Sequence, residues 1–246
     1  MATVGAIESI CLEDLGFSFG PKIKPIFVGL NYEFVKGGAY WIKSTSGGGK
    51  SSLLRILAAL VTPTAGDLKI DGVGTREMSF EEFLPYRLQI GYSFELGGLI
   101  SNKTLFENLM LPLQYHKLMA PNEATAWVEK LAEIFEISEH LHSRPSRVSG
   151  SIKKATVVAR AFVMKPRVLI LDEPTIGLSQ SRKDALCKLV HDGRESGQFH
   201  IVITATDDVT FARKVATKTL EMRSQRIEET EVVQNAFIIT HKKASS

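Results

Sequence analysis

Cysteine is scarce in this chain of 246 residues: it has two, Cys11 and Cys187, far apart in the sequence. Such a pair lacks the clustered spacing of a zinc site, so we expect free thiols in a reducing compartment rather than a disulfide framework. The sequence also has no uninterrupted apolar run of about 18 residues, which a membrane-spanning helix needs. Its N-terminal stretch lacks a basic segment followed by an apolar one, so we expect no secretory signal.

A strong excess of charge of one sign is absent as well. The 30 Lys and Arg residues nearly balance the 27 Asp and Glu residues, which leaves a net charge of +3. That excess is too small to indicate a nucleic-acid partner, and we expect none. The hydrophobic share of 44% and charged share of 23% are ordinary for a folded protein. The length allows one large domain, or two lobes, with a proper core.

A glycine-rich loop is the most informative stretch of the sequence. Phosphate-binding loops follow the pattern Gly-x4-Gly-Lys-[Ser/Thr]. Gly49, Lys50 and Ser51 fit its second half, whereas Ser44 stands where the first glycine belongs. A flexible Gly/Ser turn is the alternative interpretation of the same residues. The candidate nucleotide-binding residues of the loop are Ser44, Thr45, Ser46, Gly47, Gly48, Gly49, Lys50, Ser51 and Ser52.

The chemistry of this loop favours phosphate. Its glycines reach positive φ and have no Cβ, so backbone N–H groups can turn inward around phosphate oxygens. Lys50 supplies a positive charge for the outer phosphates, and the Ser51 hydroxyl is a hard oxygen ligand for Mg²⁺. The residues before the loop, 39–42, indicate a short strand, and residues 52–60 indicate a helix. The loop would therefore bring an anion to a helix N-terminus, where backbone donors and the helix dipole favour it.

A second group of candidate residues follows a later strand. The apolar run from Val168 to Leu171 is typical of a parallel strand buried on both faces, and it ends in Asp172 and Glu173. Open α/β sheets bind ligands at the carboxyl ends of their strands. Asp172 is then a candidate to hold Mg²⁺ through a water, and Glu173 to orient or deprotonate an attacking water. The alternative is a solvated loop start. With Lys50 and Ser51, the acids predict a nucleoside-triphosphatase site.

These motifs resemble those of ATP-binding-cassette (ABC) ATPases. Residues 171–178, Leu-Asp-Glu-Pro-Thr-Ile-Gly-Leu, are similar to the second Walker motif of that family. Val148-Ser149-Gly150-Ser151 stands at the place of its Leu-Ser-Gly-Gly-Gln signature, and Ala159-Arg160-Ala161 follows as in the family. The resemblance runs from about Ile10 to Ile227. Within the family, residues 94–102, 106–108 and 111–113 resemble the ATPases of Mce/Mla-type systems, which move phospholipids between membranes.

The resemblance implies the α/β fold of P-loop NTPases. This fold has a mostly parallel core sheet flanked by helices, an N-terminal antiparallel β subdomain and an inserted helical subdomain. We expect the ATP-binding domain at residues 1–228, its helical insertion at about 96–165 and a C-terminal tail at 229–246. In the family, two ATP-binding subunits clamp two ATP molecules, and their closure drives an integral membrane permease. The expected location is cytoplasmic, peripheral on the inner face of the cell membrane.

The resemblance also assigns roles to individual residues. Phe19 matches the aromatic residue that stacks on adenine, and Glu173 matches the catalytic carboxylate. The signature residues would contact the γ-phosphate held by the partner subunit. The implied cofactors are ATP and Mg²⁺. The expected signature residues are Ser149, Gly150 and Ser151, and the expected Mg²⁺ ligands are Ser51, Glu95 and Asp172.

The departures from the family pattern lie mainly at residues that act in ATP hydrolysis rather than in ATP binding. Glu95 replaces a glutamine that contacts the metal and the attacking water, and Ser151-Ile152 replace the Gly-Gln of the signature. Ser179 replaces an aspartate, and Ala205 stands where we place the switch histidine, which contacts the γ-phosphate. Losing one group that stabilises transition-state charge slows a reaction by about 10²–10³. We therefore expect ATP binding with attenuated hydrolysis.

Two functions remain open at this point. One is a transporter ATPase subunit that works with a permease, with lipids as the candidate cargo; retained Glu173 favours it. The other is a hydrolysis-deficient, nucleotide-gated subunit that regulates a partner or completes a heterodimer; the lost histidine and signature residues favour it. A soluble ABC protein that acts on nucleic acid or ribosomes usually carries two cassettes, so one cassette and the small net charge argue against it.

Overall fold

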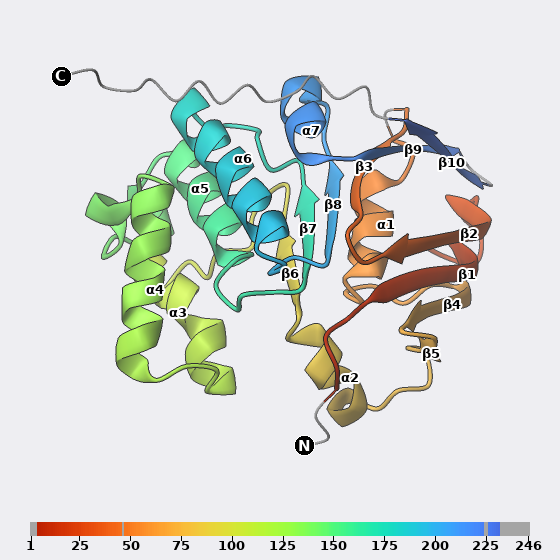
Figure 1. The fold of residues 1–246 in the computed structure, drawn as a ribbon, viewed down its shortest axis with the longest axis horizontal. Helices are drawn as coiled ribbons and strands as arrows, with labels where there is room; N and C mark the ends of the chain where they lie inside the picture. The colour runs from red at the N-terminus through yellow and green to blue at the C-terminus, as the bar shows by residue number, and fades with distance from the viewer. Residues whose placement is uncertain (1–3, 46, 224–225, 232–246) are drawn as a thin grey trace.

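Two β-sheets and two groups of helices form the α/β fold (Figure 1). The computed structural model describes residues 4–45, 47–223 and 226–231. Ser46 and most of the predicted tail, residues 232–246, lie outside this range. Among the described residues, no helix is long and apolar enough to cross a membrane.

The smaller sheet is antiparallel and lies toward the N-terminus, as predicted. Its strand order is β2-β1-β4-β5, and Leu12 of β1 pairs with Tyr32 of β2 and with Leu68 of β4. The buried positions of β1 and β2 are mostly apolar, whereas the exposed positions include Glu13 and Asp14 of β1 and Asn31 and Glu33 of β2. The strands are β1 (Ser9–Phe17), β2 (Phe27–Val35), β4 (Ala65–Ile70) and β5 (Val73–Gly74).

The core sheet is mostly parallel, with the order β10-β9-β3-β8-β7-β6. Only the β9–β10 pair is antiparallel among its described strands. Every residue of β7 and β8 is buried, as the apolar run from Val168 predicts for a strand covered on both faces. The strands are β3 (Ala39–Lys43), β6 (Ile90–Ser93), β7 (Val168–Asp172), β8 (Ile201–Ala205), β9 (Lys218–Arg223) and β10 (Arg226–Glu231).

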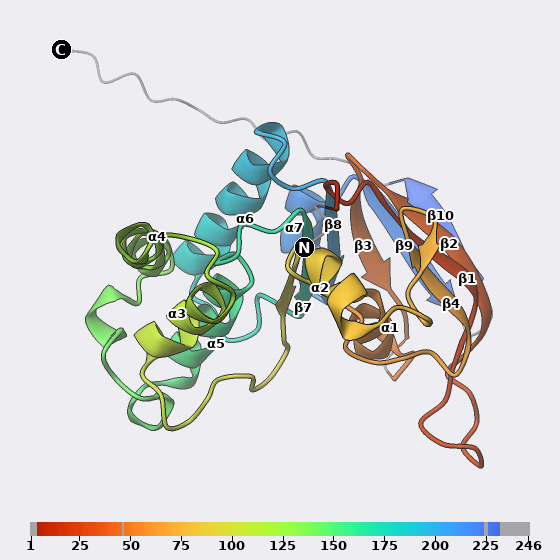
Figure 2. The same cartoon turned by 90° about the horizontal axis from the view of Figure 1, so that it is seen from below.

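Helices cover both faces of the core sheet and create two hydrophobic cores. The apolar face of α1 packs between the two sheets, where it shares one core with β1, β2 and residues of the core sheet (Figure 2). The helices α3 to α7 share the other core with the opposite face of β7 and β8. The helices outside the helical insertion are α1 (Lys50–Leu57), α2 (Phe80–Arg87), α6 (Gln180–Glu195) and α7 (Val209–Val215).

A helical group lies within the range 96–165 predicted for the insertion. It sits beside the core sheet, on the side of α6 (Figure 1). Its elements are α3 (Leu105–His116), α4 (Pro121–Ile134), the 3-10 turns η1 (Ser138–His140) and η2 (Pro145–Arg147), and α5 (Gly150–Arg160). The predicted end of the domain at residue 228 is wrong, because β10 continues to Glu231 and pairs there with Lys218.

Candidate nucleotide-binding site

The glycine-rich loop joins β3 to α1, and its glycines are needed for its shape. Gly47 and Gly49 have φ of 75° and 87°, a region that side chains disfavour. A Cβ on Gly49 would lie 2.8 Å from the Phe27 ring, and one on Gly48 would lie 2.7 Å from Ser44 Oγ. Ser44, at the position of the first glycine, donates its hydroxyl to the Thr45 carbonyl at 3.0 Å.

The start of α1 presents backbone donors at this loop. Gly49 is the N-cap, and no side chain caps the helix by a hydrogen bond. The first N–H groups of a helix have no partner within the helix, and the helix dipole adds positive character there. An anion placed on the loop would meet these groups directly.

The two halves of the predicted site meet in the structure. The Ser51 hydroxyl donates to Asp172 Oδ1 at 3.1 Å, and Lys50 Nζ lies 3.8 Å from Glu173 Oε1. The cause is topological: β3 and β7 flank β8 in the parallel sheet, so their carboxyl ends share one edge. Glu173 follows β7 directly with a φ of 41°, a strained value for a non-glycine residue that occurs often at functional sites.

Burial sets the protonation behaviour of the two acids. It raises the pKa of Asp172, while hydrogen bonds from Ser51 and Tyr92 act in the opposite direction. Burial also raises the pKa of Glu173, against a hydrogen bond from the backbone of Asp207. A carboxylate with a raised pKa is a stronger base than an exposed one, which suits a group that takes a proton from water.

The donor set at this edge fits Mg²⁺ bound together with phosphates. Ser51 Oγ and the Asp172 carboxylate are hard oxygen ligands that already lie within 3.1 Å of each other. No group of three or more His, Cys, Asp or Glu side chains that could hold a metal is found in the described part of the chain. Mg²⁺ commonly takes one or two protein oxygens and completes its shell with water and substrate phosphates.

The other predicted residues are more scattered. Phe19 lies on the loop after β1, 66% exposed, with its ring edge-on to Phe17 at 5.2 Å. Glu95 is half-buried after β6, and its carbonyl accepts a hydrogen bond from Lys154 at 2.9 Å. Among the described residues, no hydrogen bond or ion pair joins its carboxylate to the loop. Thr45 is exposed and Ser52 is half-buried.

The signature residues begin α5, away from the phosphate loop. Ser149 is the N-cap and accepts from Ile152 N at 3.3 Å, while Gly150 has open space around it. Arg182 of α6 donates to Ser151 Oγ at 2.8 Å. In the described part of the chain, no hydrogen bond or ion pair links these residues to Lys50.

The prediction for Ala205 is wrong in one respect. Its side chain is fully buried in the core and its carbonyl accepts from Glu173 N at 2.8 Å, so it does not face the site. Asp207 faces it instead: its carboxylate lies 2.7 Å from Lys50 Nζ, and its N–H donates to Glu173 Oε2 at 3.2 Å. The strand ends at Ala205, and the chain needs two further residues to turn toward the loop.

Besides Asp207, sequence reasoning missed two other contributors. Tyr92 donates its hydroxyl to Asp172 Oδ2 at 3.2 Å. Lys154 of α5 is buried and holds the carbonyls of Phe94 and Glu95. For Asp207 a signal existed, because Asp207-Asp208 follow β8 much as the acidic pair follows β7. For Tyr92 and Lys154 no local pattern distinguishes them from core or surface residues.

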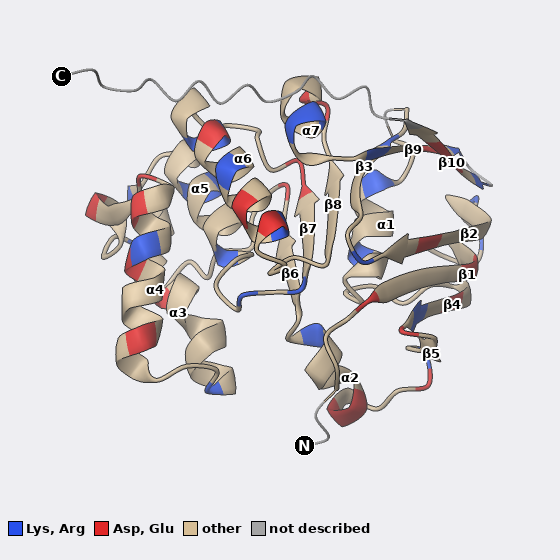
Figure 3. Ribbon diagram, in the orientation of Figure 1, with Lys and Arg blue, Asp and Glu red and all other residues tan. Residues whose placement is uncertain are grey.

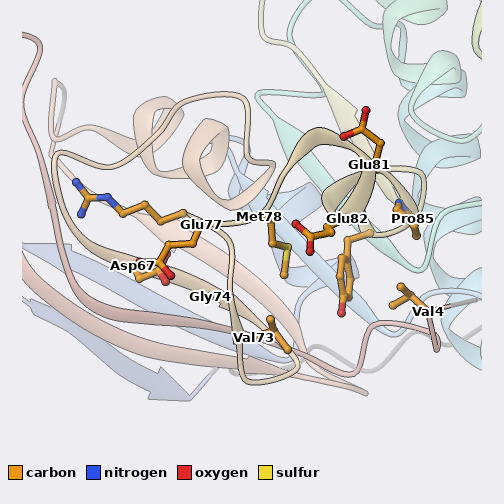
Figure 4. A pocket seen from close by; sticks show the side chains of 11 residues that line it. Val4, Asp67, Val73, Gly74, Glu77, Met78, Glu81, Glu82 and Pro85 are labelled. Atoms are coloured by element: carbon orange, nitrogen blue, oxygen red, sulfur yellow. The ribbon is translucent and has the colours of Figure 1, made fainter. Parts of the chain in front are cut away.

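A pocket of about 750 Å³ lies elsewhere, between β5 and α2 (Figure 4). Its lining includes the apolar residues Val4, Val73 and Met78 and the acids Glu81 and Glu82. None of the predicted site residues lines it. Glu82 is already used, because it closes the capping box of α2 with Ser79.

Comparison with known proteins places these features in a family. The family described as ABC transporter matches residues 27–176. The chain is 30% identical to the methionine import ATP-binding protein MetN of Carboxydothermus hydrogenoformans, over 93% of this chain and 68% of that protein. It spans 61% of the MetN of Desulfitobacterium hafniense, also at 30% identity over 85% of this chain. It is 29% identical to the lipoprotein-releasing system ATP-binding protein LolD of Bacteroides fragilis, over 87% of this chain and 97% of that protein.

The fold comparison agrees. The ATP-binding cassette MJ0796, in a dimeric post-hydrolysis structure bound to ADP and Pi, aligns with a TM-score of 0.82 at 24% identity, over 91% of this chain and 98% of that chain. This likeness confirms the predicted fold. The family match covers more than half of the sequence. The chain therefore belongs to the ABC transporter family as one of its ATP-binding subunits.

Proposed function

We propose that this chain binds Mg-ATP between its glycine-rich loop and the acids after β7, hydrolyses it slowly, and couples both steps to a membrane permease. The observation that carries this proposal is the meeting of the two motifs, with Ser51 Oγ 3.1 Å from Asp172 Oδ1. The N–H groups of α1 and the Lys50 ammonium take the phosphates. Phe19, exposed and next to Phe17, offers its ring to the adenine.

Hydrolysis needs a group that takes a proton from the attacking water. Glu173 is that group: it lies next to Lys50, and burial raises its pKa. Water forms a bond to the terminal phosphorus, its proton passes to Glu173, and the bond to ADP breaks with its electron pair on ADP. Mg²⁺, held through Ser51 and Asp172, would neutralise charge on the phosphates.

Two positions in the described site slow this reaction. Asp207 brings a negative charge where the family uses a histidine donor, and a carboxylate cannot stabilise charge on the transferring phosphate. Ile152 stands where the family has glutamine and is 7% exposed within α5, so this position presents no polar side chain to a nucleotide. The same positions favour the second candidate, a hydrolysis-deficient subunit that switches a partner by nucleotide occupancy.

Turnover separates the two candidates. The purified chain is assayed for ATP hydrolysis alone and in the membrane-extracted complex, beside Asp207→His and Glu173→Gln. A slow ATPase predicts weak turnover that rises in Asp207→His and vanishes in Glu173→Gln, with ATP still bound. If wild type and Asp207→His are both inactive in the complex, the non-hydrolysing subunit is correct. Brisk turnover of the wild-type chain alone contradicts attenuation.

The permease contact is proposed for the segment from Glu95 to Glu107. It exposes Leu96 (78%) and Ile100 (38%), and Asn108 holds it by accepting from Ile100 N at 2.7 Å and donating to its carbonyl at 3.1 Å. A groove of about 370 Å³ beside it is lined by Phe94, Leu111 and Tyr115, among others. Docking there would hold the chain at the inner face of the cell membrane, in the cytoplasm.

This contact is tested by cross-linking. Ser101→Cys in a Cys11→Ser background should cross-link to a permease that co-purifies from native membranes, whereas Ser196→Cys on the end of α6 should not. Equal labelling of both positions contradicts the assignment. Phospholipid cargo is proposed from the resemblance of residues 94–113 alone; the relatives named above belong to methionine import and lipoprotein release. Lipid analysis of the purified complex tests it.

A further inference from the structure

The proposed hydrolysis assigns no proton transfer or metal ligand to the Asp207 carboxylate. Its Oδ1 lies 2.7 Å from Lys50 Nζ, closer than the 3.8 Å from that ammonium to Glu173 Oε1. The Lys50 side chain is 16% exposed and that of Asp207 is 87% exposed. The ammonium thus lies inside the site, while the carboxylate reaches it from the solvent side.

The backbone around Asp207 is fixed even though its carboxylate is exposed. Its own N–H donates to Glu173 Oε2 at 3.2 Å, and the next N–H, of Asp208, donates to Thr206 Oγ1 at 3.1 Å. Asp208 has a structural task, since it caps α7 through Phe211 N and pairs with Lys183 at 2.8 Å. Among the described residues, the Asp207 carboxylate caps no helix and contacts Lys50 instead. Its charge is therefore held beside Lys50 without serving the helix.

The Asp207 carboxylate is positioned to affect one phosphate of a bound nucleotide more than the others. In the proposed binding mode, the start of α1 would hold the inner phosphates, and the terminal phosphate would meet the attacking water beside Glu173. The Asp207 N–H donates to Glu173 Oε2, so the Asp207 carboxylate would lie on the side of the terminal phosphate. A diphosphate would end before this point. A triphosphate adds negative charge next to the carboxylate and competes with it for Lys50.

We propose that the Asp207 carboxylate is a specificity-determining group that disfavours the terminal phosphate, so that the site binds ATP and ADP with more similar affinity than it would without this charge. This inference rests on the proposed function. Its consequence is that ADP competes well with ATP, and that the ratio of the two nucleotides governs occupancy of the site.

The test is the ratio of ATP to ADP dissociation constants, measured by isothermal titration calorimetry with Mg²⁺ present. Asp207→Asn keeps the shape of the side chain and removes its charge. It should lower the dissociation constant for ATP by about tenfold and change that for ADP by less than about twofold, an effect of the size expected for one charge near the surface. Asp207→Glu keeps the charge and should retain the wild-type ratio. Asp192→Asn removes a charge from exposed α6, where Asp192 pairs with Lys188, and should change neither constant.

The outcomes separate this inference from the proposal beneath it. If folded wild-type protein binds neither nucleotide, the proposed function fails and this inference fails with it. If wild type binds both and Asp207→Asn leaves the ratio unchanged, or shifts ATP and ADP equally, the inference alone is overturned. A ratio that changes equally in Asp207→Asn and Asp192→Asn reflects net charge and also overturns it.

Discussion

Asp172 is buried to 1% exposure, and each of its carboxylate oxygens accepts a hydroxyl hydrogen bond, Oδ1 from Ser51 and Oδ2 from Tyr92. A charge buried this deeply is tolerated when its lone pairs are satisfied. Ser51 belongs to the phosphate loop, whereas Tyr92 belongs to β6, which neighbours β7. The carboxylate is therefore oriented from two sides before any metal arrives.

Tyr92→Phe removes one of these donors and leaves Oδ2 buried without it. Hydrogen bonds to charged groups contribute about 1.5–3 kcal/mol, so we expect the free energy of unfolding to fall by about that amount. The measurement is urea denaturation of wild type and variant. Tyr115→Phe, at a 76% exposed tyrosine, is the matched control. Equal stability of the two variants would show that the Tyr92 hydroxyl does not support Asp172.

Lys154 is a buried cation that joins the helical group to the loop after β6. Its Nζ donates to the carbonyls of Phe94 and Glu95, both at 2.9 Å. Burial lowers its pKa from 10.5 to about 8, against the attraction of Asp172, Glu95 and Glu173. The folded chain therefore binds fewer protons than the unfolded chain between pH 8 and 10.5, and stability from this group rises with pH across that window.

Lys154→Met should remove this part of the pH dependence. We expect the free energy of unfolding of wild type, relative to the variant, to increase from pH 7.5 to pH 9.5, because the cost of burying the charge is relieved. Lys153→Met, at a half-buried neighbour, should keep the wild-type slope. Denaturation curves at both pH values measure the free energy of unfolding of the wild type and of each variant. A wild-type slope that survives in Lys154→Met contradicts a lowered pKa at this residue.

At the scale of elements, close packing of β6 against the segment between α5 and β7 sets the position of Tyr92. Gly91 lies in β6, and a Cβ there would overlap the Ala161 carbonyl and lie 2.8 Å from Pro166 Cγ. Gly91→Ala should therefore destabilise the fold by about 1–3 kcal/mol through overpacking. Gly5→Ala, with nothing within 4 Å of its Cβ, should have little effect. Thermal unfolding of Gly91→Ala and Gly5→Ala measures the difference. Equal midpoints for the two variants would contradict close packing of Gly91 against Ala161 and Pro166.

Elements with strong periodic patterns could be predicted from the sequence. The helix expected at residues 52–60 is α1, which spans Lys50–Leu57, and the apolar run before Asp172 is β7. In contrast, α2 was missed, because it has no buried residue and contains Pro85. Its local signal is the capping box formed by Ser79 and Glu82, which marks a helix start without any apolar stripe.

The site was predictable where chemistry and chain order coincide. Lys50, Ser51, Asp172 and Glu173 each follow from a motif, and the parallel sheet then brings them together. Asp207 did not follow, because the sequence does not show how many residues β8 needs before the chain turns toward the loop. Counting from the apolar run placed Ala205 there, and only the three-dimensional arrangement corrects it.

At the scale of the whole molecule, the site lies where the two hydrophobic cores meet. The phosphate loop belongs to the core around α1, whereas the signature helix α5 belongs to the helical core. Lys154 and Arg182 are polar links between the helical group and the sheet side. Lys, Arg, Asp and Glu are mixed along α6 (Figure 3), and the net charge of the whole sequence is only +3. Function therefore depends on the local site rather than on the overall charge.

The central claim is that one Mg-nucleotide binds between the loop and the acids, and a titration with Mg-ATP tests it most directly. Isothermal titration calorimetry is run on wild type, Lys50→Met and Glu173→Gln, with folding checked by circular dichroism. The account predicts one ATP per chain for wild type and Glu173→Gln, and a loss of at least about tenfold in affinity for Lys50→Met. No binding by folded wild-type protein, or equal binding by Lys50→Met, would contradict it.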